Sequence, residues 1–197
     1  MKTILFILSM IFLPMQLFPQ YLAIYTDYLN KVQLFDHGDI KEIEHLPVLS
    51  YQIGDEALGY EDNTSSFKVY YDNYVYTLNE FVTEYVVTDH LVAYRMNTQL
   101  KVFDRGNEKN LTIQVGEYKA GDELVAFYDR MSRIFKVYYD ARIYELDDAI
   151  AANETTEFEL GENTLVYLDS RNYYNIFWNG ETAELLYEER MKSYKVG

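Results

Sequence analysis

Cysteine is absent from the 197-residue chain, and proline (3) and histidine (3) are scarce. Without cysteine there can be no disulfide, no thiol nucleophile and no thiolate ligand for a metal. Basic residues are also few, because 17 Lys and Arg stand against 32 Asp and Glu, which gives a formal net charge of −15 at pH 7. Nucleic-acid binding needs clustered Lys and Arg facing phosphates. The composition therefore argues against a nucleic-acid partner and against cysteine chemistry.

The sequence also lacks the motifs of the common catalytic sites. His37, His45 and His90 are far apart, and no two have the i,i+4 spacing of a helical zinc site. There is no Gly-rich phosphate loop and no Gly-x-Ser-x-Gly nucleophile elbow. We therefore assign no catalytic residue, no metal ligand and no cofactor, and we expect a non-enzymatic protein rather than an enzyme.

Long apolar runs are missing except at the N-terminus. Lys2 precedes an apolar run from Ile4 to Phe18 that is broken at Pro14. A short apolar run behind a positive charge predicts a signal peptide over residues 1–20, with a retained anchor as the alternative. No later stretch is long enough to span a bilayer. We expect an exported protein of the periplasm, the outer surface or the extracellular medium.

Aromatic side chains, in contrast, are abundant, with 21 Tyr and 11 Phe. Many of them belong to a repeated phrase in which an aromatic residue is followed two positions later by an apolar one and then by Gly. Successive copies are about 33 to 40 residues apart, between the periods of solenoids and of short-bladed propellers. The copies are Tyr51–Gly54, Tyr118–Gly121, Phe158–Gly161 and Tyr194–Gly197, with Tyr85–Thr88 as a degenerate copy.

Each copy also contains further strand-like runs, such as Leu124–Asp129 and Phe135–Asp140, which are rich in β-branched and aromatic residues. Polar clusters and tight turns such as Asn179-Gly180 separate the runs. Four short antiparallel strands per copy make one propeller blade. We therefore predict an all-β, propeller-like array of about five four-stranded antiparallel blades in a single domain. Its approximate repeats are 21–48, 49–82, 83–115, 116–156 and 157–192, with a closing or partial strand at 193–197.

The two ends of the array raise the question of closure. The first copy lacks the opening phrase, and Tyr194–Gly197 supplies that phrase at the other end. Pairing of this last strand with the first blade would close a five-bladed ring and remove an exposed edge. The alternatives are a fragment of a longer repeat protein and an open or solenoid stack.

These repeats resemble a group of exported bacterial proteins. The pattern of Tyr-x-φ-Gly-Asp, Leu-Val-Ala-Tyr/Phe-x-Asp and Phe-Lys-Val-Tyr-Tyr-Asp over residues 21–197 is similar to short-repeat, propeller-like proteins of Bacteroidetes-type lineages. The resemblance implies architecture and export. The group has no established function, and the resemblance carries no catalytic signature.

One strand position alternates between aromatic and acidic side chains along the array. Tyr71, Tyr139 and Trp178 occupy it in three copies, and Asp36 and Asp104 occupy it in the other two. Aromatic rings beside carboxylates suit binding of a protein or a glycan, so these five residues are the candidate ligand-binding set. The competing interpretation is that the aromatic residues wedge between neighbouring blades.

Three functions remain open. The leading hypothesis is an exported scaffold that binds a protein or a glycan at the cell envelope. The alternative is a glycoside hydrolase or lyase with carboxylates near a propeller axis, although equivalent positions in a repeat give two carboxyl groups like environments. The third is a calcium-stabilised envelope protein that uses the acidic stretch Asp147–Glu154.

Overall fold

The chain forms only β-strands in the computed structural model, which describes residues 22–147, 157–187 and 193–196. The predicted signal peptide and most of the acidic stretch from Asp147 to Glu154 lie outside the described residues. The strands build five antiparallel sheets, the first of three strands and the other four of four strands. The prediction of an all-β propeller-like array is confirmed. Among the described residues there is no helix long and apolar enough to cross a membrane.

Each sheet is one blade, and its strands are adjacent in sequence. Blade 1 consists of β1 (Leu22–Thr26), β2 (Val32–Asp36) and β3 (Asp39–Glu44). Blade 2 consists of β4 (Ser50–Ile53), β5 (Ala57–Glu61), β6 (Ser66–Tyr71) and β7 (Tyr74–Glu80). Blade 3 consists of β8 (Glu84–Val87), β9 (Leu91–Met96), β10 (Gln99–Asp104) and β11 (Asn107–Thr112).

The last two blades have the same order. Blade 4 consists of β12 (Val115–Ala120), β13 (Leu124–Asp129), β14 (Ile134–Tyr139) and β15 (Arg142–Asp147). Blade 5 consists of β16 (Phe158–Leu160), β17 (Thr164–Leu168), β18 (Tyr173–Trp178) and β19 (Glu181–Tyr187).

The tight turn between the last two strands of every blade has left-handed backbone. In blade 2 it is Asp72-Asn73, with φ of 46° and 67°. In blade 5 it is Asn179-Gly180, with φ of 51° and 79°. Two consecutive positive φ angles match the twist of a β-hairpin, which is why Asn, Asp and Gly are found here. The turns predicted from these residues are confirmed.

An aspartate organises the other hairpin of most blades. In blade 2 the carboxylate of Asp62 accepts hydrogen bonds from the backbone N–H of Thr64 (2.8 Å) and Ser66 (3.0 Å). Lys68 lies 2.8 Å from the same carboxylate and 2.6 Å from Glu44 of blade 1. Burial alone would raise the pKa of Asp62, but the hydrogen bonds from Lys68, Thr64 and Ser66 lower it well below its usual range.

The hydrophobic core is divided into four clusters, each between two neighbouring blades. Alternate residues of a strand face the preceding and the following blade, so the middle strands are buried on both faces, as the pattern of β13 shows. Aromatic residues dominate the fully buried set, with Tyr60, Tyr94, Phe127 and Phe135 at 0% exposure. The fold is therefore held by face-to-face blade packing, without disulfides.

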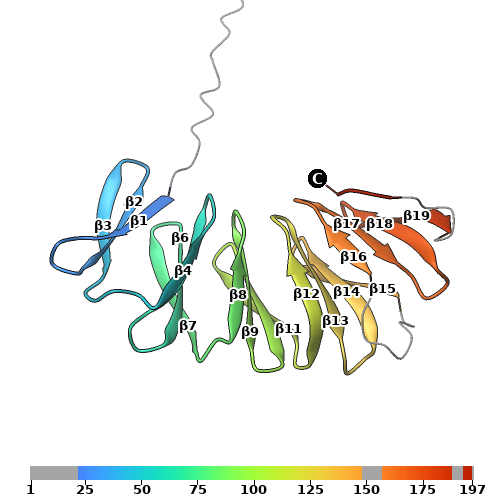
Figure 1. Cartoon of the computed structure of the whole chain (residues 1–197), viewed down its shortest axis with the longest axis horizontal. Helices are drawn as coiled ribbons and strands as arrows, with labels where there is room; N and C mark the ends of the chain where they lie inside the picture. Colours follow the sequence, from blue (N-terminus) through green and yellow to red (C-terminus); the bar gives the residue numbers. More distant parts are fainter. Residues whose placement is uncertain (1–21, 148–156, 188–192, 197) are drawn as a thin grey trace, which may run out of the picture.

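The five blades stand side by side in an open arc, with blade 1 and blade 5 at opposite ends (Figure 1). The predicted pairing of the C-terminal strand with blade 1 is not what the structure shows. The ring of Tyr194 packs on Tyr174 of blade 5, with 5.1 Å between ring centroids. Among the described residues, blade 1 contains only its own three strands. Residues 193–196 therefore lie against blade 5, where the Tyr194 hydroxyl also donates to Glu157 at 3.4 Å.

Candidate functional site

The five residues predicted to bind a ligand occupy equivalent positions at the ends of β2, β6, β10, β14 and β18. They do not meet in one site, because each lies in a different blade. Four of them make the contacts between blades, whereas Trp178 is 56% exposed. A ligand role for this set stays a prediction. The four members are Asp36, Tyr71, Asp104 and Tyr139.

The two aspartates form one kind of junction, which we call the Asp–Tyr interface, between blades 1 and 2 and between blades 3 and 4. Asp104 accepts a hydrogen bond of 2.7 Å from the hydroxyl of Tyr138 in the next blade, and the amine of Lys109 lies over the Tyr138 ring at 5.5 Å. Asp36 accepts the equivalent bond from Tyr70. Because a buried carboxylate needs hydrogen-bond donors, each of these tyrosine hydroxyls helps to join its blade to the preceding one.

The tyrosines form the other kind of junction, the Tyr–Phe interface, between blades 2 and 3 and between blades 4 and 5. The Phe103 ring lies 6.1 Å from Tyr71 and 4.9 Å from Tyr76 of the preceding blade. The Phe177 ring lies 5.9 Å from Tyr139 and 5.3 Å from Tyr144. These tilted and edge-on pairs are the favoured geometry of aromatic packing.

The turn glycines belong to the Tyr–Phe interface. A Cβ added to Gly106 would lie 3.4 Å from the Tyr76 hydroxyl, and one added to Gly180 would lie 3.2 Å from the Tyr144 hydroxyl. The turns of the Asp–Tyr interfaces carry Asn73 in blade 2 and Ala141 in blade 4 at this position. The two kinds of interface therefore repeat every two blades, and this period corresponds to the alternation of aromatic and acidic residues in the sequence.

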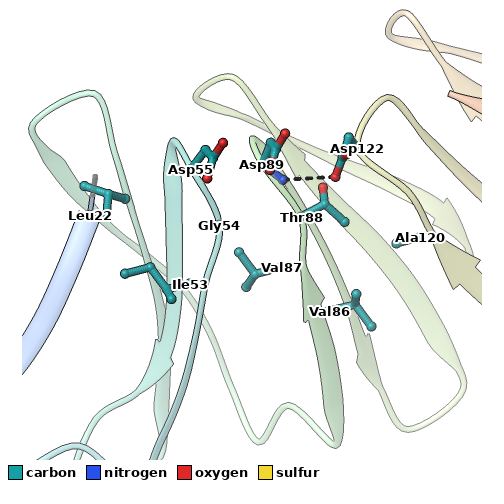
Figure 2. Close-up of a pocket in the computed structure, with 10 residues that line it drawn as sticks. All are labelled: Leu22, Ile53, Gly54, Asp55, Val86, Val87, Thr88, Asp89, Ala120 and Asp122. Carbon is teal, nitrogen blue, oxygen red and sulfur yellow. Dashed lines mark hydrogen bonds between the residues drawn. The ribbon is translucent and has the colours of Figure 1, made fainter. Parts of the chain in front are cut away.

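A pocket of about 530 Å³ lies elsewhere, where the first strands of blades 2, 3 and 4 run side by side (Figure 2). The chain brings these strands close because Gly54 has no side chain: a Cβ there would lie 1.8 Å from the Thr88 carbonyl oxygen. The next residues are joined across blades, since the Glu56 and Ala57 N–H groups donate to the Asp89 carbonyl at 2.8 and 3.0 Å. We call the residues that directly follow the opening phrases, such as Asp55, Asp89 and Asp122, the inner rim.

Three carboxylates of the inner rim, Asp55, Asp89 and Asp122, stand together at one edge of this pocket (Figure 2). The Asp89 N–H donates to Asp122 Oδ1 at 3.4 Å. Burial and the negative charges of Asp122 and Asp55 raise the pKa of Asp89, with His90 acting in the opposite direction. Apolar side chains form the rest of the lining: Leu22, Ile53, Val86, Val87 and Ala120.

This pocket was not predicted from the sequence, although its signal is present there. An acidic residue follows the phrase in four copies, at Asp55, Asp89, Asp122 and Glu162. Because the opening strands of successive blades are neighbours, a side chain at this one position gathers on one edge. Within the described ranges, no three or more His, Cys, Asp or Glu residues are placed to hold a metal ion.

The arrangement can attract a cation, because three carboxylates from equivalent positions of successive blades gather at one edge of the pocket. Their surroundings differ, since Asp89 lies between the other two and its pKa is raised by burial and by their charges (Figure 2). Asp104, which the sequence offered as a member of a catalytic carboxylate pair, is bonded to Tyr138 between blades.

Comparison with known structures finds several that are similar to this chain at low sequence identity. The chain is 14% identical to the computationally designed Ika8 protein (TM-score 0.42; 83% of this chain and 57% of that chain covered). It is 7% identical to human WBSCR16 (TM-score 0.45; 79% and 58% covered). It is 10% identical to a Kluyveromyces lactis Hsv2 structure (TM-score 0.47; 79% and 56% covered). The chain thus spans a little over half the length of these structures. No curated protein matches it.

Family comparison is more specific. The sequence model of the 10-bladed beta propeller domain matches residues 16–197, which include all five blades. The chain therefore belongs to the 10-bladed β-propeller domain family.

Proposed function

We propose that the protein is a non-enzymatic binding scaffold, exported to the cell envelope, which holds a basic segment of a partner protein in the inner-rim pocket. The observation that carries the proposal is the edge of three carboxylates, Asp55, Asp89 and Asp122, beside an apolar lining. Propeller folds supply such sites on rigid strands.

The chemistry of the pocket fits Lys and Arg side chains. The ammonium or guanidinium group would lie at the carboxylates, and the aliphatic stem would lie against the apolar lining, such as Val86 and Val87. The net charge of −15 also attracts a basic partner over distances longer than the contacts in the pocket, which favours encounter. An added cation would also relieve the repulsion that raises the pKa of Asp89.

The test is binding of a labelled peptide of alternating Arg and Val residues, followed by fluorescence anisotropy at low and high salt. Replacing Asp55, Asp89 and Asp122 together by Asn should weaken binding by about tenfold or more, since three charges leave the pocket while oxygen acceptors remain. Binding by the unchanged protein should weaken as salt increases.

A matched triple variant provides the control. Asp39→Asn, Asp72→Asn and Asp140→Asn remove the same charge from exposed turns on other parts of the blades. The control should bind the peptide within about twofold of the unchanged protein. Equal losses in the two triple variants would show that only overall charge attracts the peptide, and the proposed site would be rejected.

The carbohydrate-active enzyme remains the second candidate that the sequence raised. Turnover in a polysaccharide screen that is abolished by Asp104→Asn would favour it over the scaffold. Export is tested separately, by N-terminal sequencing of the protein recovered from the medium or the envelope fraction of the producing cells. A protein that stays in the cytosol with Met1 retained would contradict it.

A further inference from the structure

Both ends of the arc present faces that are blade-to-blade contacts elsewhere in the molecule. At the blade 1 end, Tyr25 is 44% exposed. The equivalent residues of the other blades pack on the preceding blade and are at most 2% exposed: Tyr60, Tyr94, Phe127 and Tyr167. Blade 1 therefore carries a packing face that no described blade covers.

The face of blade 5 that points away from blade 4 also carries exposed apolar side chains. Trp178 is 56% exposed and Leu185 is 42% exposed. Their equivalents in blade 4, Tyr139 and Leu146, are partly buried against the core cluster that joins blades 4 and 5. Apolar residues that are covered at every internal junction are thus uncovered at the last one.

Residues 193–196 begin to cover that face as the first strand of a further blade would. Tyr194 packs on Tyr174 at 5.1 Å between ring centroids. The same pair of positions is filled in blades 4 and 5 by Phe135 and Phe158, at 5.0 Å. Among the described residues, blade 1 has strands equivalent to the second, third and fourth of other blades and none equivalent to the first.

The two end faces also complement each other. Blade 1 carries Phe35 and Gly38, the residues with which blades 3 and 5 complete a Tyr–Phe interface. A Cβ added to Gly38 would meet nothing within 4 Å, so the space beside this turn is open in the structure. The partner of such a face is an aromatic residue, and blade 5 presents Trp178 where blades 1 and 3 present aspartate.

We propose that two copies of this chain close a ten-bladed ring, in which blade 5 of each copy packs on blade 1 of the other. Residues 193–196 of one copy would take the place of a first strand beside blade 1 of the second copy. Closure within one copy is not the arrangement of the arc, because its end blades lie far to either side of the three middle blades (Figure 1). The ten blades of such a ring agree with the number in the family's description.

The experiment measures the mass of the purified full chain by light scattering over a dilution series and follows the fluorescence of Trp178, the single tryptophan. We expect a mass of two chains at high concentration. Dilution should yield single chains, and the Trp178 emission should move to longer wavelength over the same concentrations, because the ring of the indole would return to water.

Trp178→Asp should weaken association by about 100-fold, since it places a charge in the centre of the apolar contact. Tyr74→Asp is the matched control, because Tyr74 is 66% exposed but lies in blade 2, away from both ends. It should leave the dissociation constant within about twofold. Far-UV circular dichroism verifies that both variants keep the fold.

A shortened chain that ends at Lys192 keeps Trp178 but removes the donated strand, and it should also remain single. Single chains of the unchanged protein at all concentrations would overturn the proposal, whether or not Trp178 is buried. Association that is equally strong in Trp178→Asp and Tyr74→Asp would overturn it as well, because the contact would then lie elsewhere.

Discussion

The contact between Tyr138 and Asp104 allows a direct test of how the blades are joined. Tyr138→Phe keeps the ring, over which the Lys109 amine lies, and removes only the hydroxyl that donates to Asp104 Oδ2 at 2.7 Å. Asp104 is only 9% exposed, and its other oxygen, Oδ1, has no hydrogen-bond partner within the part of the chain that the structure describes. The substitution therefore removes a hydrogen bond from a buried carboxylate, which keeps only longer contacts from Oδ1 to His90 Nε2 (3.9 Å) and Arg105 Nη1 (4.0 Å) within the described residues.

The expected loss follows from the kind of bond removed. A hydrogen bond to a charged group contributes about 1.5–3 kcal/mol, and a buried acceptor left unpaired costs more than an exposed one. We expect Tyr138→Phe to lower the free energy of unfolding by about 2–3 kcal/mol. The neighbouring Tyr139→Phe removes a 2.9 Å bond from its hydroxyl to Asn179 Oδ1 in an exposed place. Its loss should be about 0.5 kcal/mol.

The assay is urea unfolding of the unchanged protein and both variants at one protein concentration, followed by circular dichroism. A third variant combines Tyr138→Phe with Asp104→Leu. It should recover more than half of the unfolding free energy lost in Tyr138→Phe, because it leaves no buried acceptor without its donor. The reasoning is refuted if the two Tyr→Phe variants lose equal stability, or if the double variant is no more stable than Tyr138→Phe alone.

Three other predictions use the same unfolding measurement. Gly54→Ala should cost about 3 kcal/mol, because its Cβ would lie 1.8 Å from the Thr88 carbonyl oxygen; a loss below about 1 kcal/mol would contradict the close approach of the two blades. Asp104→Tyr alone should destabilise by burying the Tyr138 hydroxyl without its acceptor, and adding Tyr138→Phe should recover stability by creating a Tyr–Phe interface; no recovery would show that the interfaces are not exchangeable. Asp89→Asn should stabilise the protein at pH 7 but not at pH 3: the pKa of Asp89 is raised in the folded state, so its ionised form opposes folding only above that pKa. The same effect at both pH values would argue against this origin.

The blades were predictable because the information for them is local. Each blade needs strand-forming runs, hairpin loops and tight turns, and all of these recur within one period. Asn179-Gly180 illustrates this, because its residue types suit a left-handed turn whatever the neighbouring blade is. Repetition of the same signals in successive copies made the architecture evident in spite of weak individual strands.

The contacts between blades were not predictable, because they join residues a whole repeat apart. The alternation of Asp36, Tyr71 and Asp104 was visible in the sequence, but its partners were not. Asp36 accepts a hydrogen bond from Tyr70, which lies 34 residues later in the chain. The residues around Tyr70 in the sequence are those of an ordinary strand, so nothing there identifies it as the partner of Asp36. The inner rim was missed for a similar reason, since Asp55 and Asp89 become neighbours only when Gly54 lets two blades approach.

The alternation of interfaces gives each blade a way to distinguish its neighbours. Repeats of similar sequence can dock on the wrong copy during folding, because their strands and hairpins are nearly equivalent. A Phe at the position of Tyr138 would leave Asp104 without its donor, and a Tyr at the position of Phe103 would put a hydroxyl between Tyr71 and Tyr76. Each mismatch should therefore lower the free energy of unfolding by roughly 2–3 kcal/mol, as expected for Tyr138→Phe.

The alternation of interfaces has an exception at blade 5, where Trp178 stands in place of the aspartate of blades 1 and 3. In the proposed ring of two copies this exception would occur twice, once at each contact between blade 5 and blade 1. An aromatic residue there suits the Phe35 and Gly38 of another blade 1, whereas an aspartate would lack a donor. In the proposed ring, Trp178 would therefore make the contact between blade 5 of one copy and blade 1 of the other.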